Sequence, residues 1–331
     1  MHLTRREFNK LSLLSGAALL GDIQVPPEEV KKEFPVAIVK TADRESGIAK
    51  AVGLLGKINF SGKNIYLKGS YNSPDSFPAA THPDALDACV RWLRGKGAKN
   101  ITLAERSGMG QTRDVLGKLG VIDKLRELDV AFLPLDELPP EDWLHLELAG
   151  SHWPSGIEAP AFLQRDDVCV VQLCNLKTHR FGGEFSASLK NAIGFIAKYA
   201  AQDGRNYMKD LHNSPWQGAM IAEVNQVYAP ALIVMDAVQT FIAGGPEKGE
   251  KADSGIIAAA FDRVALDAVG LAILQHSGAE SFRNLENIFD QAQLKRAAEL
   301  NLGARSPDEI RIVSSEEDAH LAETLENFLK K

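Results

Sequence analysis

The sequence has few cysteines, no excess of basic residues and no long apolar run, and each of these absences excludes a class of protein. Three cysteines cannot supply the four thiolates of an iron–sulfur cluster, and no CxxC pair is present for a zinc ribbon or a c-type haem. Lysine and arginine total 37 against 44 acidic residues, whereas proteins that bind nucleic acid through its phosphates usually carry a basic excess. No apolar run approaches the roughly 20 residues of a membrane-spanning helix. We therefore expect no nucleic-acid partner and no iron–sulfur cluster.

The remaining composition is that of a globular protein with a sizeable core. The chain has 331 residues, of which 45% are hydrophobic and 24% are charged. Cys169 and Cys174 flank an apolar segment at an odd spacing, which places them on opposite faces of a strand. Cys89 lies among apolar residues of a predicted helix. We predict that all three are buried free thiols.

The first residues have the layout of an export signal. Arg5 and Arg6 precede Phe8 and Lys10, and a mild apolar stretch follows. This layout is typical of a signal peptide, and the paired arginines resemble the twin-arginine signal. An amphipathic N-terminal helix is the alternative interpretation. We expect residues 1–22 to be a signal that the twin-arginine translocation machinery reads.

This signal predicts an exported protein that resides in the periplasm or another extracytoplasmic compartment. No clean small-x-small cleavage site follows the apolar stretch, so an uncleaved signal would tether the protein to a membrane. We divide the rest of the chain into a linker at 23–34, a main domain at 35–314 and a C-terminal helical tail at 315–331.

Strand and helix patterns alternate along the main domain. Strands are expected at 35–40, 64–68, 100–104, 129–133, 167–173, 231–235, 255–261 and 310–313, and helices at 44–55, 82–94, 111–128, 185–199 in part, 215–228, 262–275, 287–301 and 316–330. Thr81 and Asp84 resemble a capping box for the second helix. Residues 134–166 form an irregular excursion. The alternation predicts an α/β fold with a mainly parallel sheet, helices on both faces and Rossmann-like layering.

Polar groups follow the carboxyl ends of five predicted strands, where ligands bind in open α/β sheets. These groups begin at Lys68, Glu105, Asn175, Asp236 and Asp262. If the strands are parallel, the groups converge on one edge. The alternative interpretation for any single residue is that it is polar because loops at strand ends are exposed to solvent. The set as a whole predicts a shared cleft.

Lysines and a histidine in these segments predict a basic pocket in an acidic protein. Lys68, Lys177, His179 and Lys190 would form it, and a local positive field suits a carboxylate or a phosphate. A helix that starts near Lys190 would add backbone N–H donors. The alternative is that the lysines point to solvent on separate faces, which is the usual fate of lysine.

We assign roles within this pocket by chemical type. Lys177 and His179 are the candidate catalytic residues, His179 for proton transfer because its unperturbed pKa is near 6.5, and Lys177 because a buried lysine can act as a base or nucleophile. The residues expected to bind a small anionic ligand are Lys68, Asn72, Lys190, Asn191, Asp236, Gly244 and Gly245.

No complete catalytic motif decides between an enzyme and a binding protein. GxGxxG, GxxxxGK[ST], HExxH and GxSxG are absent. His82, His179 and His212 with Asp236 or Asp262 could bind a metal, but their spacing matches no standard set, so we assign no metal ligands. A further alternative is a non-catalytic accessory protein, or a metal-binding protein, of an exported redox system. The cofactor and the oligomeric state are left open.

The order of these segments resembles the domain of unknown function 362 family over roughly residues 36–275. The matching stretches are Lys68 to Asn72, Thr81-His82-Pro83, Leu176 to His179, Ser188 to Gly194, Asp236-Ala237-Val238, Gly244-Gly245-Pro246 with Gly249, and Asp262 with Asp267-Ala268. The resemblance implies an α/β fold and no particular reaction. Some members are iron–sulfur proteins through an added ferredoxin-like segment, which this chain lacks. The family's Lys-Pro-Asn corresponds here to the stretch from Lys68 to Asn72.

Overall fold

The computed structural model describes residues 33–180, 184–201 and 203–331. The predicted signal at 1–22 and nearly all of the predicted linker lie outside these residues. Cys89 and Cys174 are buried free thiols, whereas Cys169 is half-buried. Cys174 packs in the core on one face of the sheet and Cys169 against the core on the other, as their spacing predicts.

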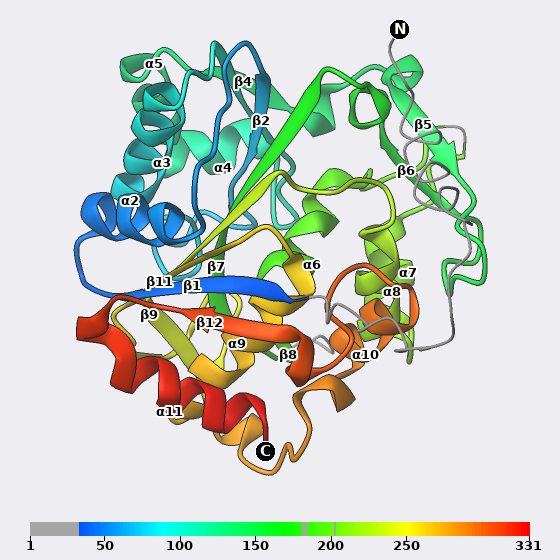
Figure 1. Cartoon of the computed structure of the whole chain (residues 1–331). Coiled ribbons are helices and arrows are strands. Elements are labelled where there is room, and N and C mark those ends of the chain that lie inside the picture. Colours follow the sequence, from blue (N-terminus) through cyan, green and yellow to red (C-terminus); the bar gives the residue numbers. More distant parts are fainter. Residues whose placement is uncertain (1–32, 181–183, 202) are drawn as a thin grey trace, which may run out of the picture. The chain divides into compact units, whose positions relative to one another are not determined.

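Ten strands within the described residues form one mixed sheet, which confirms the predicted fold class (Figure 1). Eight of the strands follow one another across the sheet, and β8 and β10 pair at its side. Of these eight, seven run in one direction and β11 runs against them, because β11 pairs antiparallel with both of its neighbours. The order across the sheet is β12 (Ile310–Val313), β1 (Phe34–Lys40), β11 (Ile256–Ala260), β9 (Leu232–Gly244), β7 (Val168–His179), β2 (Asn64–Lys68), β3 (Asn100–Glu105) and β4 (Ala131–Pro134), with β8 (Glu184–Ser186) on β7 and β10 (Gly249–Ala252) on β9.

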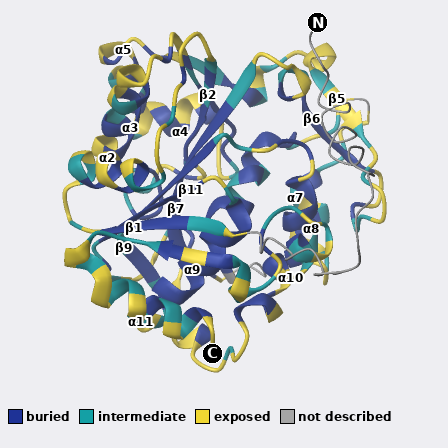
Figure 2. Cartoon of the chain, viewed as in Figure 1, coloured by how far each residue is buried: buried dark blue, intermediate teal, exposed yellow. Residues whose placement is uncertain are grey.

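Helices cover both faces of this sheet, as predicted (Figure 1). One face packs against α2 (Arg44–Leu54), α3 (Pro83–Gly95), α4 (Thr112–Lys118) and α5 (Val121–Glu127). The other packs against α6 (Ser188–Asn191), α7 (Tyr207–Asn213), α8 (Gln217–Val224), α9 (Arg263–His276), α10 (Ala292–Glu299) and α11 (Ala319–Leu329). Helix α9 is buried from Arg263 to Leu274, and all of these residues except Arg263 and Asp267 are apolar, as expected for a helix enclosed by the core (Figure 2).

The predicted convergence of five strand ends is wrong for β11. After β9 the chain turns back through the short strand β10 and pairs with β9 again, without a crossover helix, so β11 is antiparallel to β9. Its carboxyl end therefore lies at the opposite edge of the sheet. Asp262, which follows β11, caps α9 by accepting the N–H of Ala265 at 2.7 Å.

Several local predictions also differ from the structure. Strand β7 runs to His179 rather than ending at 173, because it continues into a hairpin with β8. The N-cap of α3 is His82, whose Nδ1 accepts the N–H of Asp84, and not Thr81, whose hydroxyl accepts the N–H of Ser70. The helix expected at 111–128 divides into α4 and α5 at Gly120, which has a φ of 70°. The excursion at 134–166 holds a two-stranded sheet, β5 (Trp143–Leu146) and β6 (Ile157–Pro160).

The strand order changes direction between β2 and β7. From β2 the chain adds β3 and β4 on one side, and from β7 it adds β9 on the other. Such a switch point leaves a crevice beyond the carboxyl ends of the two strands, where open α/β sheets bind their ligands.

A basic cavity at the switch point

A cavity of about 430 Å³ lies at the carboxyl ends of β2, β3 and β7. The segment around α6 and the helix α7 complete its wall. Six of the residues predicted to form the site line this cavity, namely Lys68, Asn72, Lys177, His179, Lys190 and Asn191. We call it the basic cavity, because Glu105 is the single carboxylate among the described residues that line it, against Lys68, Arg106, Lys177 and Lys190.

Lys68 and Glu105 form a buried ion pair in the wall. Lys68 Nζ lies 2.6 Å from Glu105 Oε1 and donates to the carbonyl oxygen of Gly69 at 2.8 Å. The two side chains are 3% and 1% exposed, so neither charge reaches bulk water. Burial lowers the pKa of Lys68 and raises that of Glu105, whereas their mutual attraction opposes both shifts. Glu105 Oε2 has no hydrogen-bond partner among the described residues.

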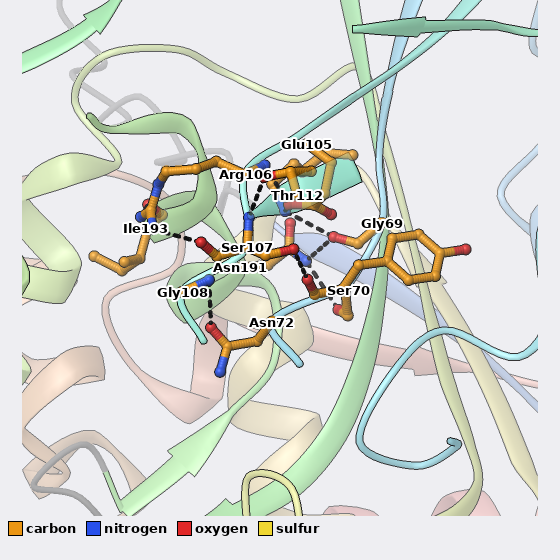
Figure 3. Close-up of polar contacts among 12 residues, drawn as sticks. Gly69, Ser70, Asn72, Glu105, Arg106, Ser107, Gly108, Thr112, Asn191 and Ile193 are labelled. Atoms are coloured by element: carbon orange, nitrogen blue, oxygen red, sulfur yellow. Dashed lines mark hydrogen bonds and ion pairs between the residues drawn. The ribbon is translucent and has the colours of Figure 1, made fainter. Parts of the chain in front are cut away.

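Arg106 binds main-chain carbonyl groups rather than a carboxylate. Its guanidinium donates to the oxygen of Ile193 at 2.5 Å (Figure 3) and to that of Ile196 at 2.8 Å. Burial lowers its pKa to about 10. These bonds tie the end of β3 to the 3₁₀ turn Ala192–Phe195 that follows α6.

Lys177 lies within strand β7, beyond the end predicted for this strand at residue 173. Its Nζ donates to the carbonyl oxygens of Pro78 at 3.0 Å and Ala79 at 2.5 Å, and Asn175 Nδ2 also donates to Pro78. Desolvation lowers the pKa of Lys177 to about 7, because no carboxylate among the described residues forms an ion pair with it.

Lys190 differs from these cations because its side-chain nitrogen has no hydrogen bond or ion pair with any described residue. It is half-buried and lines the basic cavity. Desolvation lowers its pKa to about 8. Lys190 is therefore the lysine of the cavity whose ammonium group can bind a ligand without first giving up a contact with the described residues.

Two asparagines join the loops that surround the cavity. Asn191 Nδ2 donates to the oxygen of Gly69 at 2.7 Å and to Ser70 Oγ at 3.0 Å, which ties α6 to the end of β2 (Figure 3). Asn72 Oδ1 accepts the N–H of Gly108 at 3.1 Å. Both predicted residues thus lie at the cavity, and Asn191 Nδ2 and Asn72 Oδ1 already form hydrogen bonds within the protein.

Three predicted ligand-binding residues are not among those that line the cavity. Asp236 is fully buried in β9 and forms an ion pair with Arg44 Nε at 2.7 Å. Gly244 and Gly245 form the turn from β9 to β10 with φ of 79° and 77°. A Cβ on Gly245 would collide with the carbonyl oxygen of Thr178. These glycines let two main-chain segments approach each other rather than a ligand.

The candidate metal ligands do not converge in the described part of the chain. His179 and His212 line the basic cavity, whereas His82 caps α3 and Asp262 caps α9. Within residues 33–180, 184–201 and 203–331, no group of three His, Cys, Asp or Glu side chains is placed to hold a metal ion.

The catalytic and ligand-binding residues predicted from the sequence do not include Glu105, Arg106 or Asn175, although each follows or continues a predicted strand. Their polarity at the end of an apolar strand was the available signal. The start of α6 is occupied, since the N–H groups of Ser188 and Leu189 donate to Asp267. The predicted open helix N-terminus is therefore wrong.

Three comparisons relate this chain to known proteins. A thylakoid-associated protein of Synechocystis is 24% identical over 252 residues, which cover 72% of this chain and 74% of the relative. The crystal structure of a Thermotoga maritima protein matches with a TM-score of 0.42 and 16% identity, over 71% of this chain and 57% of that one. No helix of the described residues is long and apolar enough to cross a membrane. The family model of the domain of unknown function DUF362 matches residues 65–272, and the chain therefore belongs to this family.

Proposed function

We propose that the basic cavity binds a small organic anion and that Lys190 is the residue that contacts its anionic group. The observation that carries the proposal is the ammonium of Lys190, which has no partner among the described residues and lies in a cavity with one paired carboxylate among its described lining residues. Arg106 adds to the positive field, as does Lys177 in its protonated form, whereas the charge of Lys68 is balanced by Glu105.

The rest of the wall supports an organic ligand over an inorganic anion. Met109, Ile193, Met208 and Leu211 line the same cavity and offer apolar contact area. A cavity of about 430 Å³ is within the range of small-molecule sites, which combine apolar walls with a few polar groups. A carboxylate with an apolar body matches both parts of the wall.

A catalytic role is the second candidate function, and the low pKa of Lys177 favours it. A group whose pKa is about 7 is present in both protonation states near neutral pH, which suits it to proton transfer. His179 lines the same cavity and is the second candidate for this role. A non-catalytic accessory protein would bind the anion without proton transfer by Lys177 or His179.

Binding of hexanoate, measured by calorimetry, tests the proposal. Hexanoate joins a carboxylate to an apolar chain, and hexanamide and inorganic phosphate are the neutral and the purely polar controls. We expect hexanoate to bind more tightly than either. Lys190→Met should weaken hexanoate binding at least tenfold, while Lys209→Met, an exposed lysine on α7, should leave it unchanged. Equal affinities for hexanoate and hexanamide would refute the proposal, and native mass spectrometry of the purified protein would identify a retained ligand.

We also propose that the protein is exported by the twin-arginine pathway. The support is the sequence pattern of Arg5, Arg6, Phe8 and Lys10, which lies outside the described residues. A curated relative is described as thylakoid-associated, which is consistent with action at a membrane. Replacing both arginines with lysine should retain the protein in the cytoplasm, as measured by cell fractionation. Export at an unchanged level would overturn this assignment.

A further inference from the structure

Helix α6 is capped by a carboxylate from a distant part of the chain. The N–H of Ser188 donates to Asp267 Oδ1 at 2.8 Å and the N–H of Leu189 donates to Oδ2 at 2.9 Å. The N-cap residue, Ala187, has no side-chain oxygen that could accept these N–H groups. Asp267 is fully buried on α9, so a helix that is itself buried from Arg263 to Leu274 fixes the start of α6.

The residues that follow this cap are those that face the cavity. Lys190 comes directly after Leu189, and Asn191 follows with its bonds to Gly69 and Ser70. The carbonyl oxygen of Leu189 accepts a further bond from Asn225 at 3.0 Å. The single turn of α6 is thus bound at its start and along its length, which leaves the Lys190 backbone little freedom.

Burying a carboxylate at this core position costs free energy, because the charged group loses its hydration. The carboxylate of Asp267 forms no ion pair with a described residue. Burial raises its pKa to about 7. Attraction to Arg263, one turn earlier on α9, opposes this rise without forming an ion pair. What the carboxylate adds is two acceptors for the first N–H groups of α6, in place of water or an outside anion.

We propose that Asp267 is a positioning residue that holds Lys190 in the basic cavity and closes the N-terminus of α6 to ligands. The inference rests on the proposed function of Lys190 as the anion contact. It assigns the anion to the side chain of Lys190 and not to the backbone N–H groups of α6.

The test compares Asp267→Asn with Asp262→Ala, which removes the cap of α9 itself and does not touch α6. The first measurement needs no ligand. Competitive labelling of lysines with acetic anhydride, read by mass spectrometry across pH, reports the pKa of Lys190. We expect this pKa to rise by about one unit in Asp267→Asn, since a loosened α6 lets the amine reach water, and to stay unchanged in Asp262→Ala. An unchanged Lys190 pKa in folded Asp267→Asn would overturn the inference.

A double-mutant cycle with hexanoate provides the second measurement. Asp267→Asn should weaken binding about tenfold in the wild-type background and have almost no effect in Lys190→Met, because the two residues act through one contact. If Asp267→Asn weakens hexanoate binding by the same factor in both backgrounds, the two residues act independently and the inference is contradicted. If hexanoate does not bind the wild-type protein, the proposed function fails, while the labelling result still decides the role of Asp267.

Hydrogen exchange of the wild-type protein covers the case in which Asp267→Asn does not fold. The amides of Ser188 and Leu189 should exchange as slowly as those in the buried helix α9. Exchange at the rate of an unprotected peptide would show that the carboxylate does not hold α6.

Discussion

At the residue scale, the cations of the basic cavity differ in what their nitrogen atoms contact. Lys68 has a carboxylate and a carbonyl oxygen, Arg106 and Lys177 have carbonyl oxygens, and Lys190 has no partner among the described residues. Sequence alone places these side chains near one another but cannot rank them, because the partners of Lys68 and Lys177 come from other segments. The structure therefore singles out Lys190, which in the sequence was one of several equivalent lysines.

The pH dependence of anion binding follows from the pKa of Lys190. Its pKa is about 8, and a bound anion raises it because the charged form is then favoured. Below pH 8 the amine is already charged and affinity for hexanoate should be nearly constant. Above pH 8 the dissociation constant should increase about tenfold per pH unit until the pKa of the complex is reached. Calorimetry between pH 6.5 and 9.5 measures this, and a flat profile would contradict it.

Lys190 also lowers the stability of the fold in the absence of ligand. Its pKa falls from 10.5 to about 8 on folding, so the unfolded state binds more protons between these values and stability rises with pH there. At pH 7 the charged amine costs on the order of 1–3 kcal/mol. Lys190→Met should raise the free energy of unfolding by an amount in this range at pH 7, and the difference should shrink toward pH 10.5. Urea titrations at several pH values measure it, and a destabilised variant at pH 7 would argue against a desolvated Lys190.

At the element scale, the strands and helices could largely be predicted from apolar periodicity, whereas their ends could not. Strand β2 and strand β12 have the predicted bounds. Strand β7 continues to His179 because its last residues pair with β8, a partner that periodicity does not reveal. The helix expected at 185–199 is the strand β8, the single turn α6 and a 3₁₀ turn, since Asp267 and Arg106 bind its main chain from elsewhere.

Gly194, in the 3₁₀ turn after α6, is needed for the close approach of Lys68. A Cβ at this position would lie 2.6 Å from Lys68 Nζ and 3.0 Å from Glu105 Oε1. Gly194→Ala should therefore displace the buried ion pair and lower the free energy of unfolding by about 1–3 kcal/mol, with weaker anion binding. Gly53→Ala in α2, where a Cβ meets nothing within 4 Å, is the matched control and should be neutral or stabilising. Chemical denaturation measures both, and equal stability of the two variants would refute this role.

At the scale of the whole molecule, the site is a consequence of strand order. Polar residues after apolar strands predicted a shared edge, and the change of direction between β2 and β7 opens the crevice there. The same reasoning failed for Asp262, because sequence does not show that β11 runs against the other strands. Asp267 belongs to the stretches that resemble the family, but its bond to Ser188 could not be predicted from local patterns, since the two residues are 79 positions apart.

A crystal structure with 6-bromohexanoate tests the central claim most directly, because anomalous scattering locates the bromine independently of the carboxylate. The account predicts a carboxylate within about 3.5 Å of Lys190 Nζ and a bromine beside Met208 and Leu211 on α7. The ion pair of Lys68 and Glu105 should be unchanged. A ligand bound elsewhere, or one whose carboxylate points away from Lys190 in the same cavity, would contradict the account.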